Sequence, residues 1–263
     1  MNLGGRSVLL TGATGGIGNV VARALAARGA TVILTGRRAE PLAALADELG
    51  GRAIAADLTE PGAPQALLAD AGDVDVLVAN AGLPASGELT SFSPDEIDRA
   101  IAVNLRAPIM LARLLAPAFV ARRSGHLVFV SSLAARAATP HSSVYSATKF
   151  GLRGFSLGLR QDLAEHGVGV SCVLPGFIRD AGMFADSGAT LPPGVGTSSP
   201  DEVAAGIVRA IEGNRAEVDV APLGLKAGAR LGGLAPALTA SVQGRLGSFK
   251  VARAIGAGQR NKR

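Results

Sequence analysis

The chain has 263 residues, enough for one large domain or two small ones, and 48% of them are hydrophobic. Its net charge is +5, but eight basic and no acidic residues lie between Lys226 and the end, so residues 1–225 carry −3 and nucleic-acid binding is not expected. No apolar run reaches membrane-spanning length, no signal peptide is visible, and the single cysteine, Cys172, excludes an intramolecular disulfide and a cysteine metal cluster, which together favour a cytoplasmic protein without a metal.

Short runs rich in leucine and β-branched residues alternate along the chain with helical patterns. The expected strands are residues 6–12, 31–36, 52–58, 74–82, 125–132, 167–176 and 216–222. The expected helices are residues 15–29, 40–50, 94–120, 143–166 and 200–213, two of which follow a Ser-Pro-Asp-Glu opening that is typical of a capping box. This alternation predicts an α/β fold with a doubly wound, seven-stranded parallel sheet covered by helices on both faces.

Ligands of such sheets bind beyond the carboxyl ends of the strands, so the residues that follow each strand carry the functional signal. After the first strand comes TGATGGIG, which contains Gly12, Gly16 and Gly18 and opens a helix. Glycine permits a tight turn and a close approach of backbone to phosphate, and a helix N-terminus attracts an anion. A lone glycine-rich turn is a weak signal, but this position favours a dinucleotide site.

The only tyrosine in the chain, Tyr145, stands four residues before Lys149, one of only four lysines. On a helix, this spacing stacks the two side chains on one face. Carbonyl reduction requires a proton donor, and a nearby ammonium group lowers the pKa of a phenol from its ordinary value of about 10. The pair therefore predicts a general acid, although a half-buried tyrosine beside a solvated lysine is the simpler alternative.

Six motifs, in order and each at its strand end or helix, resemble those of the short-chain dehydrogenase/reductase family in its compact form with a Tyr-x-x-x-Lys active site. They are TGATGGIG, Asn80-Ala-Gly82, Asn104 in AVNL, Ser132 placed 13 residues before Tyr145, YSATK, and Pro175-Gly176. The resemblance covers roughly residues 5–222 and implies a Rossmann-like fold. It also implies the following cofactor-binding residues: Gly12, Thr14, Gly16, Ile17, Gly18, Arg37, Asp57, Asn80, Gly82, Tyr145, Lys149, Pro175 and Gly176.

The resemblance implies four catalytic residues: Ser132, Tyr145, Lys149 and Asn104. Ser132 is expected to hydrogen-bond the substrate oxygen, Lys149 to hold the nicotinamide ribose, and Asn104 to position a water that passes protons to Lys149. Asn80 is expected to be structural and to tie neighbouring strands together, and Asp57 to contact the adenine. None of the three histidines has metal-ligand spacing, and His141 is expected either to face the pocket or to be exposed.

The end of the second expected strand favours NADP(H) over NAD(H). NAD-binding enzymes place an acidic residue there to hold the ribose 2′-hydroxyl. In this chain the strand runs into Arg37 and Arg38, with no acid before Glu40. Guanidinium groups pair well with phosphate, so Arg37 is the expected contact of a 2′-phosphate. The alternative is that both arginines only begin the next helix at the surface.

The segment after Pro175-Gly176 departs from the family pattern. Asp180 stands where the family has a threonine that contacts the nicotinamide carboxamide, and this role is not transferred to Asp180. Residues 181–199 are rich in small residues and include Met183 and Phe184, a composition that suits a lid over an apolar substrate or a simple connector.

The expected function is hydride transfer between NADP(H) and a ketone or secondary alcohol of an apolar small molecule, with Tyr145 as general acid and base. One alternative is a 3-oxoacyl-(acyl-carrier-protein) reductase-like enzyme that docks an acidic carrier. Another is a dinucleotide-binding regulator without turnover, against which the intact Ser132, Tyr145 and Lys149 argue.

The expected domains are residues 1–222, a single unit that includes the substrate loop 181–199, and residues 223–263, a basic, partly amphipathic extension. The apolar surplus of the two longest helices, 94–120 and 143–166, predicts a homodimer or homotetramer. The extension has helical leucine spacing but also several glycines and Pro236. We expect it to pack over the cleft or a neighbouring subunit with a disordered basic tip, and peripheral contact with an anionic membrane is the alternative.

Overall fold

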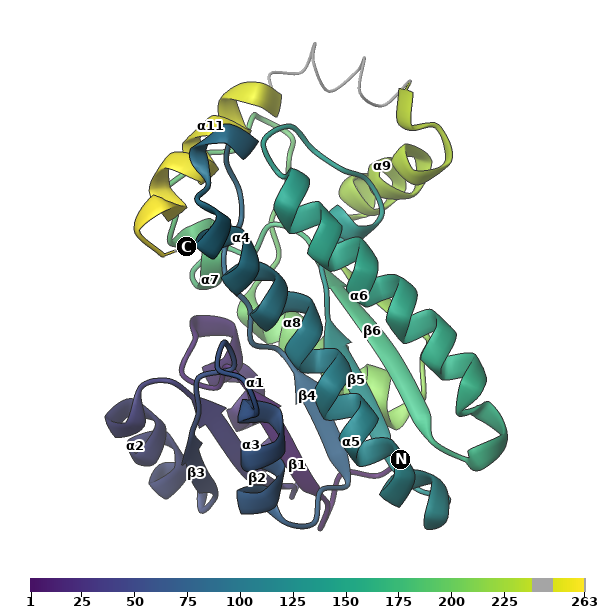
Figure 1. Cartoon of the computed structure of the whole chain (residues 1–263). Coiled ribbons are helices and arrows are strands. Elements are labelled where there is room, and N and C mark those ends of the chain that lie inside the picture. Colours follow the sequence, from purple (N-terminus) through teal and green to yellow (C-terminus); the bar gives the residue numbers. More distant parts are fainter. Residues whose placement is uncertain (238–247, 263) are drawn as a thin grey trace.

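The computed structural model describes residues 1–237 and 248–262. Its centre is one parallel sheet with the strand order β3-β2-β1-β4-β5-β6-β7 (Figure 1). The strands are β1 (Ser7–Thr11), β2 (Thr31–Gly36), β3 (Arg52–Ala55), β4 (Val76–Ala79), β5 (His126–Val130), β6 (Gly169–Pro175) and β7 (Glu217–Val220). The predicted doubly wound sheet of seven strands is confirmed, and the order reverses between β1 and β4, which is where such folds bind ligands.

Helices cover both faces of the sheet. The α-helices of the described residues are α1 (Gly16–Ala26), α2 (Ala39–Leu49), α3 (Ala63–Ala71), α4 (Pro94–Ile101), α5 (Ala107–Ala121), α6 (Ser143–Asp162), α7 (Gly182–Ala185), α8 (Pro200–Glu212), α9 (Leu223–Leu234) and α11 (Ser248–Gln259). Both predicted capping boxes are present, because Ser93 and Ser199 each accept a hydrogen bond from the backbone of the glutamate three residues on.

The two cores follow from the alternation of side chains along each strand. In β1, Val8 and Leu10 join the core formed with α1, α2 and α8, whereas Leu9 joins the core formed with α3, α5 and α6. Because neighbouring side chains of a strand point to opposite faces, a nearly continuous apolar strand requires a helical layer on each side. The sheet therefore holds its strand ends rigidly at one edge, where the glycine-rich turn lies.

Residues Pro94–Ala121 form one continuous helical segment in which α4 and α5 are joined by a π-helical turn, Ala102–Arg106. By length and composition alone the segment is apolar enough to cross a membrane, but 44% of its most apolar window is buried inside the protein. Leu111 and Phe119 of α5 are fully buried against the sheet. The segment thus covers the sheet, and its π turn coincides with the predicted site residue Asn104.

The C-terminal extension contains two helices in different surroundings. Helix α9 forms although it contains four glycines, and it ends at Leu234, just before Pro236. Helix α11 continues into a 3₁₀ turn, Arg260–Lys262, that lies at the edge of the main body (Figure 1). The expectation of a disordered basic tip is wrong for this turn, because Lys262 forms an ion pair with Asp186 at 2.8 Å. The expected division at residue 222 stays a prediction.

Candidate active site

The glycine-rich turn connects β1 to α1 and needs glycine for steric reasons. Gly12 has φ +70°, and a Cβ on Gly18 would lie 2.1 Å from the carbonyl oxygen of Gly12. Helix α1 begins after Gly15, which has no side chain to cap it, and its first turn holds no acidic residue. The free amide groups of this turn therefore form a site for an anion.

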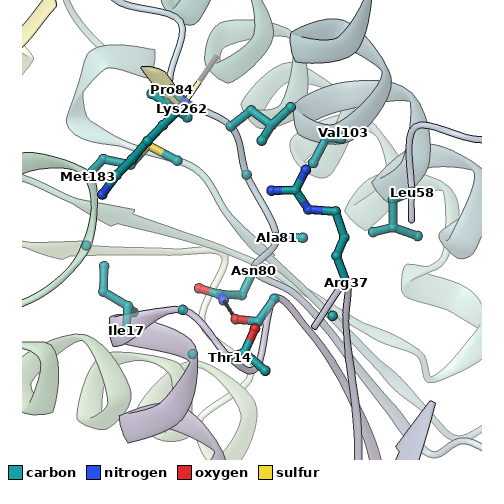
Figure 2. A pocket seen from close by; sticks show the side chains of 18 of the residues that line it. Thr14, Ile17, Arg37, Leu58, Asn80, Ala81, Pro84, Val103, Met183 and Lys262 are labelled. Atoms are coloured by element: carbon teal, nitrogen blue, oxygen red, sulfur yellow. Dashed lines mark hydrogen bonds between the residues drawn. The ribbon is translucent and has the colours of Figure 1, made fainter. Parts of the chain in front are cut away.

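A pocket of about 630 Å³ opens beyond this turn, large enough for an extended ligand (Figure 2). Nine of the predicted cofactor-binding residues line it: Gly12, Thr14, Gly16, Ile17, Gly18, Arg37, Asp57, Asn80 and Gly82. Its walls also include Leu58, Val103 and Met183. Amide donors at one end, arginines beside them and apolar side chains for flat rings suit a dinucleotide, so the residues present fit the cofactor that the sequence implies.

The two arginines after β2 differ in their surroundings. Arg38 donates a hydrogen bond to the carbonyl oxygen of Thr14 at 2.8 Å. Arg37 extends into the pocket toward Val103 (Figure 2), and the described part of the chain offers its guanidinium no hydrogen bond or ion pair. Burial tends to raise the pKa of Asp57, but hydrogen bonds from Thr59 and the nearby Arg37 cation lower it further, to below its ordinary value. Arg37 is thus the arginine available to an anion.

Asn80 holds the strand ends together. Its Nδ2 donates to the carbonyl oxygens of Thr11 and Gly12 at 3.1 and 3.3 Å, and its backbone amide donates to the Thr11 hydroxyl at 3.0 Å. A Cβ on Gly12 would lie 2.8 Å from the Cα of Ala81. These contacts join the carboxyl ends of β1 and β4 directly below the pocket.

Ser132, Tyr145 and Lys149 lie behind the wall of the pocket. Ser132 follows β5, while Tyr145 and Lys149 are one turn apart on α6. The Ser132 hydroxyl lies close enough to the Tyr145 phenol to lower its pKa, and the Lys149 Nζ lies 5.7 Å from the centre of the tyrosine ring. A Cβ on Gly82, which lines the pocket, would be 3.8 Å from the Lys149 Nζ. The structure thus brings the three residues together next to the dinucleotide pocket.

The expected effect of Lys149 on the phenol is wrong for this structure. Burial raises the pKa of Tyr145, and the contribution that lowers it comes from the neighbouring Ser132 hydroxyl. Lys149 is 3% exposed, donates instead to the carbonyl oxygen of Val130 at 3.0 Å, and burial lowers its pKa to about 8. Desolvation is the largest cause of the pKa shift of both groups, and residue spacing in the sequence does not reveal it.

We expect the tyrosinate absorbance of the ligand-free protein to titrate with a midpoint above 10, because burial disfavours the phenolate. Since the chain has one tyrosine and no tryptophan, the absorbance change on phenol ionisation belongs to Tyr145 alone. Tyr145→Phe should give a flat titration and serves as the control. A midpoint below 10 contradicts the expected direction.

Asn104 is fully buried in the π-helical turn, and its side-chain amide is occupied by the backbone of Leu83. Its Oδ1 accepts from the Leu83 amide at 2.7 Å, and its Nδ2 donates to the Leu83 carbonyl oxygen at 2.9 Å. This pairing fixes the segment after Gly82. The described contacts make Asn104 a positioning residue, and the water-holding role implied by the resemblance stays a prediction.

Some expected residues lie away from the pocket. Pro175 and Gly176 end β6, where Leu133, Ala221 and Leu225 pack against Gly176. Asp180 does not line the pocket either, and it pairs with Arg179 at 3.3 Å on the surface.

His141 lies near the C-terminal extension. Its ring contacts that of Phe249 edge to face, at 5.9 Å between centres. It therefore belongs to the region where α11 meets the body of the protein, and it does not line the dinucleotide pocket.

An ion network holds the turn after Ser132. Arg136 directly follows the short 3₁₀ turn after Ser132. It forms ion pairs with Asp219 and Glu217 of β7 at 2.8 and 3.0 Å. Arg153 of α6 bonds the same Glu217 at 2.6 Å. Burial raises the pKa of Glu217, but these two arginines outweigh it and hold the pKa below its ordinary value. The network fastens the serine turn and the tyrosine helix to one strand.

Sequence reasoning missed the pocket residues at the C-terminal turn, by which we mean residues 259–262, the end of α11 and the 3₁₀ turn after it. Gln259, Asn261 and Lys262 line it together with the glycine-rich turn. The high glycine content of the extension concealed this role, and nothing in the spacing of its residues signals a contact with residues 12–18.

Comparison with known proteins gives a consistent result. The family model for short chain dehydrogenases matches residues 6–191. The ketoacyl reductase HetN of Nostoc is 39% identical over 227 residues, which cover 83% of this chain and 79% of that protein. The 3-oxoacyl-[acyl-carrier-protein] reductase FabG of Escherichia coli is 35% identical over 185 residues, which cover 68% of this chain and 76% of that protein.

Solved structures agree in fold along nearly their whole length. A short-chain dehydrogenase from Sphingobium yanoikuyae in complex with NADPH has a TM-score of 0.77 at 30% identity, and the match covers 91% of this chain and 94% of that one. A 3-ketoacyl-(acyl-carrier-protein) reductase from Brucella melitensis complexed with NADH has a TM-score of 0.74 at 27% identity, covering 83% and 97%.

Proposed function

Because this chain belongs to the short-chain dehydrogenase/reductase family and is an NAD(P)-dependent oxidoreductase, we propose that it reduces a ketone on an apolar substrate with NADP(H) and with Tyr145 as the proton donor. The observation that carries the proposal is the placement of Ser132, Tyr145 and Lys149 next to one another, directly behind a pocket that suits a dinucleotide. Without a proton donor next to it, the pocket could bind a dinucleotide but could not support reduction of a ketone.

Each side chain has a role that its position supports. The nicotinamide ring, when bound, supplies the hydride. Ser132 holds the carbonyl oxygen of the substrate by a hydrogen bond, and the phenol of Tyr145 donates its proton to the same oxygen. Lys149, one helical turn away and beside Gly82, is placed to hold the nicotinamide ribose when the cofactor is bound. Asn104 keeps the segment after Gly82 in place through the backbone of Leu83.

The ionisation state of the ligand-free site favours reduction over oxidation. Burial raises the pKa of Tyr145, so the phenol carries its proton at neutral pH. A protonated tyrosine can donate to a carbonyl at once, whereas oxidation of an alcohol first requires the phenolate. This supports the proposed direction.

The choice of NADP(H) rests on Arg37. Its guanidinium stands in the pocket without a protein partner in the described part of the chain, next to the turn that suits the phosphates. A 2′-phosphate offers such a group a charge-assisted, bidentate partner. One solved structure of a relative contains NADPH and another contains NADH, so these structures do not select the cofactor. The argument for NADP(H) therefore rests on Arg37.

A 3-oxoacyl thioester is the ketone class that the relatives support, since HetN is described as a ketoacyl reductase and FabG as a 3-oxoacyl-[acyl-carrier-protein] reductase. The decisive experiment is a panel of 3-oxoacyl thioesters, free and carrier-bound, and of simple apolar ketones, assayed with NADPH and with NADH. We expect turnover with NADPH, and faster turnover of the carrier-bound thioester would show a docked carrier. Cofactor binding without turnover of any ketone would leave the regulator as the function.

We expect a homodimer or homotetramer in solution. Ile101 and Phe150, on the two longest helical segments, are 42% and 41% exposed, although both are large and apolar. We propose that these two side chains belong to an apolar face that a second subunit covers. Light scattering after size exclusion should give at least twice the chain mass, and Phe150→Glu should lower it. Leu234→Glu, at an exposed leucine outside these helices, is the control, and a monomeric wild-type mass at micromolar concentrations contradicts the proposal.

Membrane contact of the extension stays a prediction. Leu223, Leu231 and Leu234 of α9 are 83%, 64% and 82% exposed, beside basic residues that suit an anionic surface. Helix α11 instead packs on the main body, as the simpler expectation had it.

A further inference from the structure

The C-terminal turn forms part of the wall of the dinucleotide pocket. Gln259, Asn261 and Lys262 line the pocket together with the glycine-rich turn, which lies almost 250 residues earlier in the chain. In Figure 2, Lys262 and Met183 lie across the pocket from Thr14. A ligand that reaches from the glycine-rich turn to Met183 therefore passes beneath the end of α11.

Helix α11 is fitted closely to the two loops on which it rests. A Cβ on Gly258 would lie 2.1 Å from the carbonyl oxygen of Ser187, and a Cβ on Gly256 would lie 3.2 Å from the Cα of Gly87. The first distance leaves no room for a side chain, so Gly258 requires glycine for this contact, and the second shows that Gly256 is tightly packed. These contacts fix the position of the helix relative to the pocket.

Gln259 is 4% exposed and has one polar atom to spare. Its Nε2 donates to the carbonyl oxygen of Met183 at 3.0 Å, whereas its Oε1 has no hydrogen-bond partner among the described residues. A buried acceptor without a partner costs free energy that a ligand donor can recover. Met183 also reaches toward the reactive end of the pocket, because its Cε would be 3.2 Å from a Cβ on Gly82. The spare acceptor thus belongs to the pocket wall, beside the residue whose side chain reaches the Gly82 end, and a nicotinamide carboxamide offers NH donors of the kind it lacks.

Lys262 corrects the charge of the pocket wall. Asp186 lines the pocket, where a carboxylate would repel the phosphates that the glycine-rich turn attracts. Lys262 lines the pocket too and pairs with Asp186 at 2.8 Å. The pair leaves the ammonium group with two further donors for a phosphate oxygen.

We propose that the C-terminal turn completes the dinucleotide site, with Gln259 accepting a hydrogen bond from the nicotinamide carboxamide and Lys262 neutralising Asp186 beside the phosphates. This proposal rests on the proposed function, because it requires that a dinucleotide occupies the pocket. It assigns binding roles to residues outside the matched family segment, residues 6–191.

The test measures the dissociation constants of NADPH and NADH from nucleotide fluorescence for the full-length protein, without any substrate. Gln259→Leu and Lys262→Gln should each weaken binding about tenfold, the second more at low than at high salt. Both should weaken NADPH and NADH by the same factor, because the two cofactors share the nicotinamide and pyrophosphate. A chain that ends at Gly258 should lose both contributions while its thermal unfolding without ligand changes little.

Arg260→Gln is the matched control, since Arg260 belongs to the same turn, carries the same charge and does not line the pocket. If Gln259→Leu and Lys262→Gln bind both cofactors as Arg260→Gln does, the inference is overturned while the proposed function stands. If the wild-type protein binds neither cofactor, both are overturned. Amide hydrogen exchange supplies a second measurement: NADPH should slow exchange in α11, and unchanged exchange there contradicts the covering role.

Discussion

Tyr145→Phe should lower the rate of ketone reduction by a factor of about 10³ or more, while the protein folds and binds NADPH as before. The substitution removes a single oxygen atom, and the ring keeps its packing against the cluster of Ala85, Ala100 and Val144. General acid catalysis typically contributes 10²–10⁴-fold, and no other phenol exists in the chain to replace this one. The measurement is kcat with saturating NADPH on the best ketone of the substrate panel.

Two controls separate chemistry from structure in this experiment. The dissociation constant of NADPH should stay within about twofold of wild type, and Ser132→Ala should lower kcat as well, because it removes the hydroxyl that lies beside the phenol and is expected to hold the substrate oxygen. A Tyr145→Phe protein that keeps a tenth of the wild-type rate would show that another group donates the proton.

Arg37→Asp should reverse the preference between the two cofactors. Loss of a charge-assisted pair with the 2′-phosphate, together with repulsion from the new carboxylate, should cost about 2–3 kcal/mol, or roughly 30- to 150-fold in the dissociation constant of NADPH. The new carboxylate lies close to Asp57, whose pKa Arg37 now helps to lower, so the local field becomes more negative. NADH has no phosphate there, and its 2′-hydroxyl can donate to the aspartate, so its affinity should rise severalfold.

Arg37→Gln and Arg38→Gln are the matched variants. The first removes the charge without adding one and should weaken NADPH alone. The second breaks a hydrogen bond to the backbone of Thr14 and should weaken both cofactors alike. If the Arg37→Asp protein binds NADPH as tightly as the wild-type protein does and keeps the same preference between the two cofactors, Arg37 is not the phosphate contact.

The fold was largely predictable because it depends on periodicity. Most strands are short apolar runs, and two of the helices carry a start signal in their sequence, at Ser93 and Ser199. Such signals are local, so the sequence contains them in full. The order of the strands follows from the connection rules of βαβ units and needs no knowledge of side-chain contacts.

The site was predictable only where its residues stand at strand ends. The lining of the pocket by Gly12, Arg37 and Asp57 follows from their positions after β1, β2 and β3. The pKa of Tyr145 was not predictable, because the dominant effect is desolvation, which depends on everything packed around the ring. The contribution of Gln259 depends on where a distant helix comes to rest, and no periodic pattern encodes that.

The π-helical turn, Ala102–Arg106, sets a limit on how far this protein can be stabilised without loss of function. A π turn holds one residue more than the regular helix on either side and is less favourable, and such turns persist mostly at functional sites. Here the turn presents Asn104 to Leu83 and Val103 to the pocket. Selection for thermal stability alone would favour variants in which the extra residue is deleted, and such variants would be more stable but less active. A stabilisation campaign should therefore keep this turn fixed and draw its substitutions from the exposed faces of α4 and α5.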